Sequence, residues 1–242
     1  MTYLEMLHLK RPSFLLKAYL CFTINSFEKL KEEKSVFLHP SELTYFNSLS
    51  FERRQKSYLQ GRYCSKRALS AYLNEPDLSK IKIHRGVFEQ PIVEYPSMHN
   101  IQISISHSDE WAGAIAFPEE HPMAIDLEKI DPEKKKVIQT QCAANELKLI
   151  ESLAIADITK LTILWTVKEG LSKVLKCGFM SPFSIFEVQS VESHSEYFIW
   201  TFRNFAQYKA FSFVIGKTAC SLIAPKKTEF SIQIKELKKQ II

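Results

Sequence analysis

Residues 165–173 of this chain read WTVKEGLSK, and the interpretation of the whole sequence starts from this stretch. At the helical period of 3.6 residues, Glu169 and Lys173 lie one turn apart on one face, and Trp165 lies one turn before the glutamate. A carboxylate and an ammonium group beside an apolar anchor could hold a cation and a phosphate at one point. A Glu–Lys pair at this spacing is also a common stabilising pair of exposed helices, worth roughly 0.2–0.5 kcal/mol. The other segments of the chain therefore decide between a ligand site and a simple stabilising pair.

The composition is that of a folded globular protein. The chain has 242 residues, of which 45% are hydrophobic and 24% are charged, and this length allows one domain or two close-packed halves. The net charge of +5 favours an anionic partner, such as a phosphate-bearing ligand or an acidic protein. It is too small to indicate nucleic acid, so we expect no nucleic-acid partner.

The cysteines and the amino-terminal region favour a cytoplasmic location. Five cysteines are scattered along the chain without a CxxC spacing, which disfavours a disulfide framework or a zinc site and fits a reducing cytosol. Residues 14–24 are apolar, but Lys17 interrupts them and no small-residue cleavage site follows. Because this segment is too short to span a bilayer, we expect a buried strand and no membrane association.

The expected secondary-structure elements follow the same order twice. In the first part we expect a strand, two helices and three strands, at residues 15–24, from 40, 50–73, 81–84, 101–105 and 112–117. In the second part we expect a strand, three helices and four strands, at residues 123–127, 133–140, 145–153, 158–176, 185–191, 197–202, 210–215 and 219–223. The repeat predicts an α/β (α+β) pseudo-dimer, with similar halves at residues 1–118 and 119–242 and a ligand cleft between them.

Two carboxylates follow each other on the first strand of the second half. Asp126 and Glu128 are alternate residues, so their side chains point to the same face. Like charges at that distance repel each other unless something positive lies between them. A magnesium ion bound between the two carboxylates would offset this repulsion, and magnesium prefers oxygen ligands. A strand end with a solvated polar face is the alternative for a lone D-x-E pattern.

Residues 104–108, SISHS, end an alternating strand of the first half. Ser106 and His107 can donate hydrogen bonds to phosphate oxygens, and His107 adds positive charge when protonated. A hydrolase is disfavoured because the chain has no G-x-S-x-G turn. A polar turn that ends a strand is the plain alternative for this segment.

The helix expected at residues 50–73 is strongly basic. Its positive side chains are Arg53, Arg54, Lys56, Arg62, Lys66 and Arg67. We expect Arg53, Lys56, Arg62 and Lys66 to face outward, although their spacing prevents all of them from sharing one narrow stripe. Such a run is usually a solvated helix face, and a phosphate site needs several of its members on one side.

The order of these motifs resembles that of the 4′-phosphopantetheinyl transferases of the surfactin-synthetase-activating type. The matching stretches are ISHS at residues 105–108, D-x-E at 126–128 and W-x-x-K-E-x-x-x-K at 165–173, and residues 61–69 are similar to the family's basic helix. The resemblance implies a pseudo-dimer of two α/β halves. It also implies an enzyme that transfers the phosphopantetheine arm of coenzyme A to a serine of an acyl or peptidyl carrier protein, with release of adenosine 3′,5′-bisphosphate.

The resemblance also implies roles for individual residues. Asp126, Glu128 and Glu169 would hold magnesium on the pyrophosphate of coenzyme A, with Lys173 against the same phosphates. The implied coenzyme A contacts are Arg53, Lys56, Ser57, Lys66, Gln90, Ser106, His107 and Lys173. Glu169 and Lys173 are the catalytic residues, and Glu169, directly or through a metal-bound water, is our candidate base for the proton of the carrier serine.

Two positions depart from the family pattern. Gln90 stands where the family often has a lysine before a proline, so this position lacks a positive charge that Arg85 could replace. Gly170 stands where the family usually has alanine or serine, which lowers helix stability.

Two further functions remain open at this stage. One is a coenzyme A-binding regulatory protein without transferase activity, which the presence of Asp126, Glu128, Glu169 and Lys173 disfavours. The other is a metal-dependent phosphohydrolase on an unrelated scaffold. The sequence does not choose between fatty-acid, polyketide and nonribosomal peptide carriers. A monomer is expected, because a pseudo-dimer supplies both halves of its own cleft.

Overall fold

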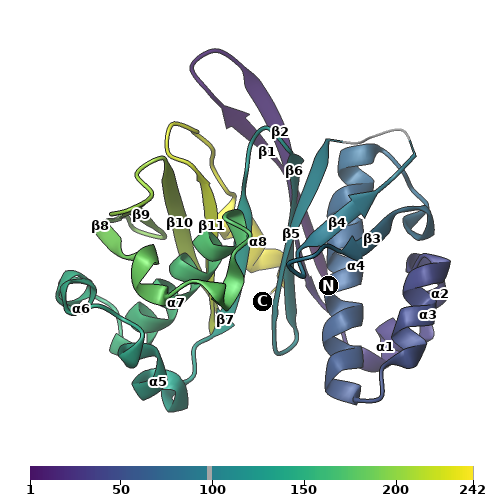
Figure 1. Cartoon of the computed structure of the whole chain (residues 1–242), viewed down its shortest axis with the longest axis horizontal. Helices are drawn as coiled ribbons and strands as arrows, with labels where there is room; N and C mark the ends of the chain where they lie inside the picture. Colours follow the sequence, from purple (N-terminus) through teal and green to yellow (C-terminus); the bar gives the residue numbers. More distant parts are fainter. Residues whose placement is uncertain (97–99, 242) are drawn as a thin grey trace. The chain divides into compact units, whose positions relative to one another are not determined.

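The computed structural model describes residues 1–96 and 100–241, without the side chain of Phe179, and the chain forms two compact units. Unit 1 comprises Met1–Pro122 together with the chain from Glu229 on, and unit 2 comprises Met123–Thr228. Figure 1 shows the elements of both units. Within the described residues, no helix combines the length and the apolar character that crossing a membrane demands.

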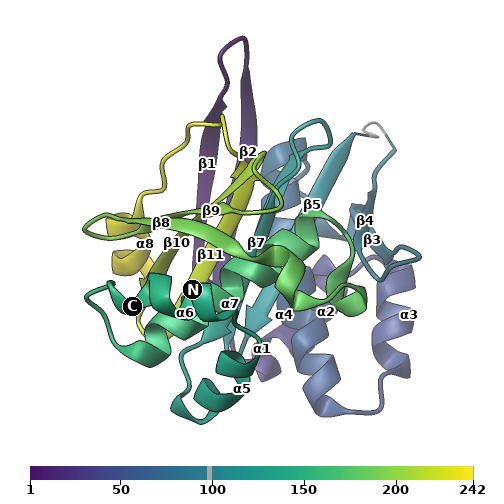
Figure 2. The ribbon, with the colours of Figure 1, turned by 60° about the vertical axis from the view of Figure 1, so that its left-hand side comes forward.

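Unit 1 is built on a four-stranded antiparallel sheet with the strand order β1-β2-β6-β5. Its elements are β1 (Thr2–Lys10), β2 (Leu15–Ile24), α1 (Phe27–Glu32), α2 (Lys34–Phe37), α3 (Pro40–Ser48), α4 (Glu52–Leu73), η1 (Leu78–Lys80), β3 (Lys82–Arg85), β4 (Pro91–Glu94), β5 (Ile101–Ser108), β6 (Trp111–Pro118) and α8 (Ile234–Ile241). Strands β3 and β4 form a separate hairpin. The connection between β1 and β2 extends well beyond the rest of the sheet (Figures 1 and 2).

Unit 2 is built on a five-stranded antiparallel sheet with the strand order β7-β11-β10-β9-β8. Its elements are β7 (Ala124–Lys129), η2 (Pro132–Lys134), α5 (Lys135–Thr140), α6 (Ala144–Glu151), α7 (Asp157–Val174), η3 (Gly178–Met180), η4 (Phe183–Phe186), β8 (Val188–Ser193), β9 (Phe198–Phe202), β10 (Tyr208–Ile215) and β11 (Thr218–Pro225). All eight elements expected from the sequence between residues 123 and 223 are present, with shifts of a few residues at their ends.

The two units share a folding pattern. In each unit a strand (β2 or β7) is followed by short helices, a long helix (α4 or α7) and then strands that include an antiparallel hairpin (β5–β6 or β10–β11). The first strand pairs antiparallel with the last strand of that hairpin, and the long helix packs across all three strands. The predicted α/β fold with two similar halves is confirmed. The cleft between the halves stays a prediction.

Helix α4 agrees closely with its sequence prediction. Its amino-terminal cap is Phe51, whose side chain forms no capping hydrogen bond, so the helix starts two residues later than predicted. The helix ends at Asn74, which adopts a left-handed backbone conformation with φ of 55°, as asparagine tolerates better than most residues. The side chains of Leu59 and Leu69 are both fully buried. Leu69 packs against the sheet, whereas Leu59 packs in the cluster that α4 forms with helices α1–α3.

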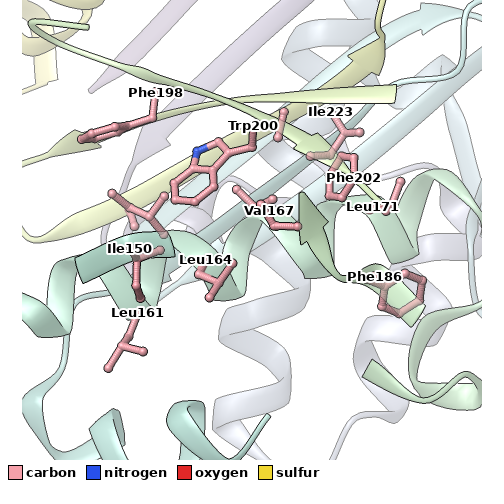
Figure 3. Packing of buried hydrophobic residues seen from close by; sticks show 14 of the residues in the cluster. Ile150, Leu161, Leu164, Val167, Leu171, Phe186, Phe198, Trp200, Phe202 and Ile223 are labelled. Carbon is pink, nitrogen blue, oxygen red and sulfur yellow. The ribbon is translucent and has the colours of Figure 1, made fainter. Parts of the chain in front are cut away.

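Helix α7 forms the centre of the core of unit 2. Leu164, Val167 and Leu171 are fully buried, at the helical spacing expected for one apolar face. They pack in one cluster with Trp200 of β9 and Ile223 of β11 (Figure 3). The arrangement fixes the position of α7 against the sheet, and the positions of its polar residues follow from it.

The last segment of the chain packs in unit 1. Lys10 and Glu229 exchange backbone hydrogen bonds of 2.9 Å, and the backbone N–H of Gln233 donates to Glu5. Helix α8 then contacts β1. Residues 119–242 were predicted to form the second half, and α8 was not foreseen. The contacts of α8 place it in unit 1. Strands β1 and β4 and helices α1 and α2 were also missed.

Gly170 of α7 has no room for a side chain. A Cβ atom at this position would lie 2.7 Å from Cγ1 of Ile223 and 3.9 Å from Cβ of Asp126. Glycine in a helix interior costs about 1 kcal/mol relative to alanine, but here it allows α7 to approach β11 closely. The departure from the family pattern at this position therefore has a packing reason.

We predict that the effect of Gly170→Ala on stability changes sign with residue 223. In the natural protein the substitution should lower the free energy of unfolding by about 1–3 kcal/mol, because Ile223 must move. In an Ile223→Ala background it should raise the free energy of unfolding by up to about 1 kcal/mol, because only helix propensity remains. Urea unfolding of the four proteins measures both effects, and an equal effect in both backgrounds would contradict the close approach.

Candidate active site

The carboxylates expected to hold a metal lie on β7 and α7 of unit 2. Asp126 is buried on β7, opposite Ser221 of β11, and Glu128 is partly buried two residues further on the same face. Lys173 of α7 donates a hydrogen bond of 2.7 Å from Nζ to Oδ1 of Asp126 and one of 3.2 Å to the carbonyl oxygen of Ile125. The structure therefore brings Asp126, Glu128 and Lys173 to one place, as the sequence predicted.

Glu169 lies in the same place, one turn before Lys173. The pKa of Glu169 is raised to about 7, mainly by burial and also by the charges of Asp126 and Glu128, while Lys173 acts to lower it. Its Oε1 atom is buried and has no hydrogen-bond partner among the described residues. A carboxylate that is buried beside other carboxylates is a good ligand for a cation, because the cation stabilises the charged form that burial and the neighbouring charges disfavour.

Glu128 forms the outer part of this cluster. Burial and the charge of Asp126 raise the pKa of Glu128, while Lys134 of η2, whose Nζ is 3.1 Å from Oε2 of Glu128, lowers it. Glu128, Lys134 and Trp165 also line a pocket of about 440 Å³. Lys134 was not foreseen, and its only sequence signal is its place in the charged segment that follows the D-x-E strand.

These residues fit a hard divalent cation by their chemistry. Asp126, Glu128 and Glu169 offer carboxylate oxygens, which magnesium prefers, and the charge of Asp126 raises the pKa of both glutamates. In the part of the chain that the structure describes, however, no three acidic, histidine or cysteine side chains form a ready-made metal cage. Asp126 and Glu128 contact Lys173 and Lys134 instead.

We predict that Glu169→Gln stabilises the metal-free protein above neutral pH. The folded-state pKa of Glu169, about 7, exceeds its ordinary value of 4.5, so ionisation destabilises the fold progressively as pH rises from 4.5 to 7. After allowance for solvent screening, the variant should melt roughly 2–6 °C higher than the natural protein at pH 8 in chelator.

At pH 4, where Glu169 is protonated in both states, the two melting temperatures should coincide. Glu192→Gln, a change at an exposed glutamate of β8, serves as the control and should leave the melting temperature unchanged at both pH values. A difference between Glu169→Gln and the natural protein that does not change with pH would contradict this prediction.

A basic pocket of about 670 Å³ lies in unit 1 between α4, α3, β5 and the β3–β4 hairpin. It is lined by Tyr45, Leu49, Arg53, Arg54, Ser57, Tyr58, Gly61, Arg62, Arg85, Glu89, Pro91, Ile105 and His107. Four arginines and a histidine face a single carboxylate there. This excess of positive charge, with donors in fork geometry, suits a ligand that carries several phosphate groups.

Contacts within the pocket wall hold two of these arginines. The guanidinium group of Arg62 lies over the ring of Tyr58, with 4.8 Å between its Cζ and the ring centroid. Arg85 pairs with Glu89 at 2.6 Å and lies over the ring of Tyr45, at 5.4 Å from the centroid. Tyr45 and Tyr58 were not foreseen as lining residues. The spacing of Tyr58 and Arg62, one helical turn apart, could have indicated this stacked pair.

Three of the expected coenzyme A contacts line this pocket, namely Arg53, Ser57 and His107. Arg85, the expected substitute for the missing lysine, also lines it. Gly61 of α4 faces Ile105 and His107 of β5, whose side chains would lie 3.4 and 3.9 Å from an added Cβ, at ordinary contact distance. The ISHS strand and the basic helix therefore meet as the sequence suggested.

The other expected contacts lie elsewhere. Lys66 was expected to face outward, and this is wrong: the side chain is fully buried and pairs with Glu42 of α3 at 2.5 Å. Lys56 pairs with Glu110 at 2.7 Å. Ser106 is buried on the face of β5 opposite to His107.

Gln90 closes the turn between β3 and β4. Its Oε1 accepts a hydrogen bond of 2.9 Å from the backbone N–H of Phe88, and its amide packs directly on Gly86. The structure does not place Gln90 among the residues that line the pocket. Lys56, Lys66, Ser106 and Gln90 therefore do not line the basic pocket, and Arg54, Arg62 and Arg85 take their place in its wall.

An acidic cluster that fits a hard cation and a basic pocket that fits phosphate are two parts that phosphoryl-type transfer requires. The family model of the 4′-phosphopantetheinyl transferase superfamily matches residues 122–223, which make up nearly all of unit 2. Holo-(acyl-carrier-protein) synthase of Mycoplasma capricolum is 34% identical over 91 residues, which are 37% of this chain and 81% of that protein. The chain belongs to the 4′-phosphopantetheinyl transferase superfamily.

A second relative matches both units. The 4′-phosphopantetheinyl transferase gsp of Aneurinibacillus migulanus is 25% identical over 193 residues, which are 79% of this chain and 74% of that protein. Among solved structures, a holo-(acyl-carrier-protein) synthase of Bacillus anthracis in complex with CoA (3′,5′-ADP) covers 46% of this chain and 96% of its own, at 19% identity and a TM-score of 0.36. The family and the class of enzyme predicted from the sequence are confirmed.

Proposed function

We propose that this protein transfers the 4′-phosphopantetheine arm of coenzyme A to a serine of an apo carrier protein, with magnesium as its cofactor. The observation that carries this proposal is the meeting of the W-x-x-K-E-x-x-x-K helix with the D-x-E strand. Lys173 contacts Asp126 there at 2.7 Å, beside Glu169, whose pKa burial raises to about 7. These residues fit the charges of a pyrophosphate and its cation.

The basic pocket of unit 1 supports coenzyme A as the donor. Its arginines and His107 suit the 3′-phosphate and the nucleotide end, and Tyr45 and Tyr58 offer aromatic faces for the adenine. Binding here fixes one end of the donor, and such positioning supplies much of the rate in phosphoryl-type transfer.

The chain's own residues can carry the proton and the charge of the reaction. The hydroxyl oxygen of the carrier serine attacks the phosphorus that bears the pantetheine arm, and the bond from this phosphorus to the bridging oxygen of the bisphosphate breaks. Glu169, as a carboxylate, accepts the serine proton. Lys173 stabilises the negative charge that develops on the leaving bisphosphate. When bound to Asp126, Glu128 and Glu169, magnesium supplies further charge neutralisation at the pyrophosphate oxygens.

We further propose an acidic carrier and a monomeric enzyme. The net charge of +5 favours docking of an acidic protein, and one chain supplies both the carboxylate cluster and the basic pocket. The five cysteines are free thiols, which favours a reducing compartment such as the cytoplasm.

Intact-mass spectrometry of apo carrier proteins tests the proposed reaction. Incubation with the enzyme, coenzyme A and magnesium should add one phosphopantetheine to the carrier, and a chelator should abolish the gain. Asp126→Asn should lower the rate by about 100-fold or more, because it removes a charge from the cation site without changing its shape, whereas Glu192→Gln should be normal. No gain on acyl or peptidyl carriers, together with binding of coenzyme A, would instead indicate a regulatory binding protein.

We predict that His107→Ala weakens recognition of the 3′-phosphate specifically. The KM for coenzyme A should rise about tenfold, because a charge-assisted hydrogen bond to phosphate is lost. The KM for 3′-dephospho-coenzyme A should stay within about twofold of that of the natural enzyme. His8→Ala, at an exposed histidine of β1, is the control. A similar rise for both substrates would place the 3′-phosphate away from His107.

A further inference from the structure

Each unit contains a lysine of its long helix that is buried against a glutamate of the preceding helix. In unit 2, Lys168 of α7 is 1% exposed and lies 2.8 Å from Glu146 of α6, which is 0% exposed. In unit 1, Lys66 of α4 is 0% exposed and lies 2.5 Å from Glu42 of α3, which is 3% exposed. The helices involved are labelled in Figure 1.

In unit 2 the glutamate joins three elements. Glu146 is the third residue of α6, and its Oε2 accepts a hydrogen bond of 2.8 Å from the backbone N–H of Ala143, the cap of the same helix. Its Oε1 accepts one of 2.9 Å from the backbone N–H of Val188, at the start of β8. Lys168 of α7 donates to the same carboxylate, so that α7 is the third element held by Glu146. Lys168 also donates to the carbonyl oxygen of Gln141 at 3.2 Å.

Unit 1 repeats the contacts of the glutamate, whereas the carbonyl oxygen that accepts from the lysine comes from η1, after the long helix. Glu42 is the third residue of α3, and its Oε2 accepts a hydrogen bond of 2.9 Å from the backbone N–H of the cap residue His39. Its Oε1 accepts one of 3.1 Å from the backbone N–H of Ile83 in β3, the first strand after the long helix. Lys66 also donates to the carbonyl oxygen of Leu78 at 3.2 Å.

A buried ion pair is a costly way to hold two helices together. Desolvation of both charges offsets much of their attraction, and apolar side chains of similar volume often give equal stability. A hydrogen-bonded pair, unlike apolar packing, also fixes the orientation of the helices that carry it. It does so because both carboxylate oxygens and the ammonium group have defined partners. The same pair in both units therefore indicates a need for a defined rotation of each long helix.

In unit 2 this rotation decides where Glu169 points. Lys168 directly precedes Glu169, so their side chains lie about 100° apart around α7. With Lys168 held towards α6 and β8, Glu169 turns towards β7, where the charges of Asp126 and Glu128 act on it. Loss of the pair would leave only the apolar face of α7 to hold the turn that carries the candidate base and metal ligand.

In unit 1 the corresponding pair holds a pocket residue. Arg62 lies one turn before Lys66 on α4, and its Nε is 3.3 Å from Oε1 of Glu42. Arg62 lines the basic pocket with its guanidinium group over Tyr58. The carboxylate that binds Lys66 therefore also attracts an arginine of the pocket wall by charge, although the Nε atom of Arg62 forms no hydrogen bond to it.

We propose that the two buried pairs are positioning devices with separate duties. Lys168 and Glu146 position Glu169 for the cation, and Lys66 and Glu42 position Arg62 for the nucleotide. The assignment of these ligands rests on the proposed function. The positioning itself acts on the geometry of each unit and is measurable without transfer.

Lys168→Met and Lys66→Met test the proposal as matched variants. For each, we would measure binding of Mn²⁺ to the enzyme with saturating coenzyme A and no carrier, by electron paramagnetic resonance. We would also measure binding of adenosine 3′,5′-bisphosphate without metal, by calorimetry. Lys168→Met should weaken Mn²⁺ binding by about tenfold or more, as loss of a residue that orients a metal ligand does, and leave bisphosphate binding within about twofold.

Lys66→Met should show the opposite pattern, with weaker bisphosphate binding and Mn²⁺ binding near that of the natural protein. Lys168→Arg keeps the charge and should restore most of the Mn²⁺ affinity. If Lys168→Met does not fold, Glu146→Gln replaces it, because the amide oxygen can still accept from Val188. Thermal melting curves show how much of each variant is folded at the temperature of the binding measurement, and each affinity is calculated for the folded protein.

Two results would overturn the proposal. In one, the folded variants keep both affinities and lose only melting temperature, so that the pairs merely stabilise the fold. In the other, each variant weakens both ligands equally. The natural enzyme could fail to modify any carrier while Lys168→Met loses only Mn²⁺ affinity and Lys66→Met loses only bisphosphate affinity. That result would reject the proposed transfer and still support the positioning roles.

Discussion

The contact between Lys173 and Asp126 joins the two segments on which the candidate active site depends. Its length of 2.7 Å requires the last turns of α7 to lie against β7, and the missing side chain of Gly170 allows α7 to lie close to β11, the strand paired with β7. Glu169 is brought beside Asp126 by the same packing, and burial there raises its pKa to about 7. The placement of α7 against the sheet therefore determines which charges meet in the site and raises the pKa of Glu169. This placement depends on the apolar face of α7, which packs on Trp200 and Ile223.

The two units use one scaffold for opposite charges. Both place a long helix across an antiparallel sheet and fix it with a buried lysine and glutamate. Unit 2 directs carboxylates from this scaffold towards β7, whereas unit 1 lines a pocket with arginines from α4 and the β3–β4 hairpin. A donor with a pyrophosphate and a nucleotide needs both kinds of site, and a duplicated scaffold allows each to be shaped without affecting the other.

Much of the fold and of the acidic cluster could be predicted from the sequence, because both follow local rules. Period-2 alternation places Asp126 and Glu128 on one face, and helical period aligns Glu169 with Lys173. The basic pocket was predicted only in part. Arg85 and Tyr45 reach it through the pairing of β3 with β4 and the packing of α3, and such tertiary contacts leave no periodic signal. The strand β1 was missed because its polar and apolar residues alternate weakly before a turn of Pro12 and Ser13.

Lys66 shows why charge alone misleads in such a helix. A lysine among arginines on a helix is usually solvated, and its helical position does not reveal the carboxylate of Glu42, which comes from an earlier helix. The second unit contains the same pair, because Glu146 and Lys168 have the same roles there. A helix whose third residue is glutamate, followed by a long helix with a lysine in its second half, occurs twice in the chain. When element order repeats, a charged residue should therefore be interpreted together with its counterpart in the other half. Lys66 corresponds to Lys168, which lies within the motif of the active site. This correspondence indicates that Lys66 is a buried structural residue and does not contact the ligand.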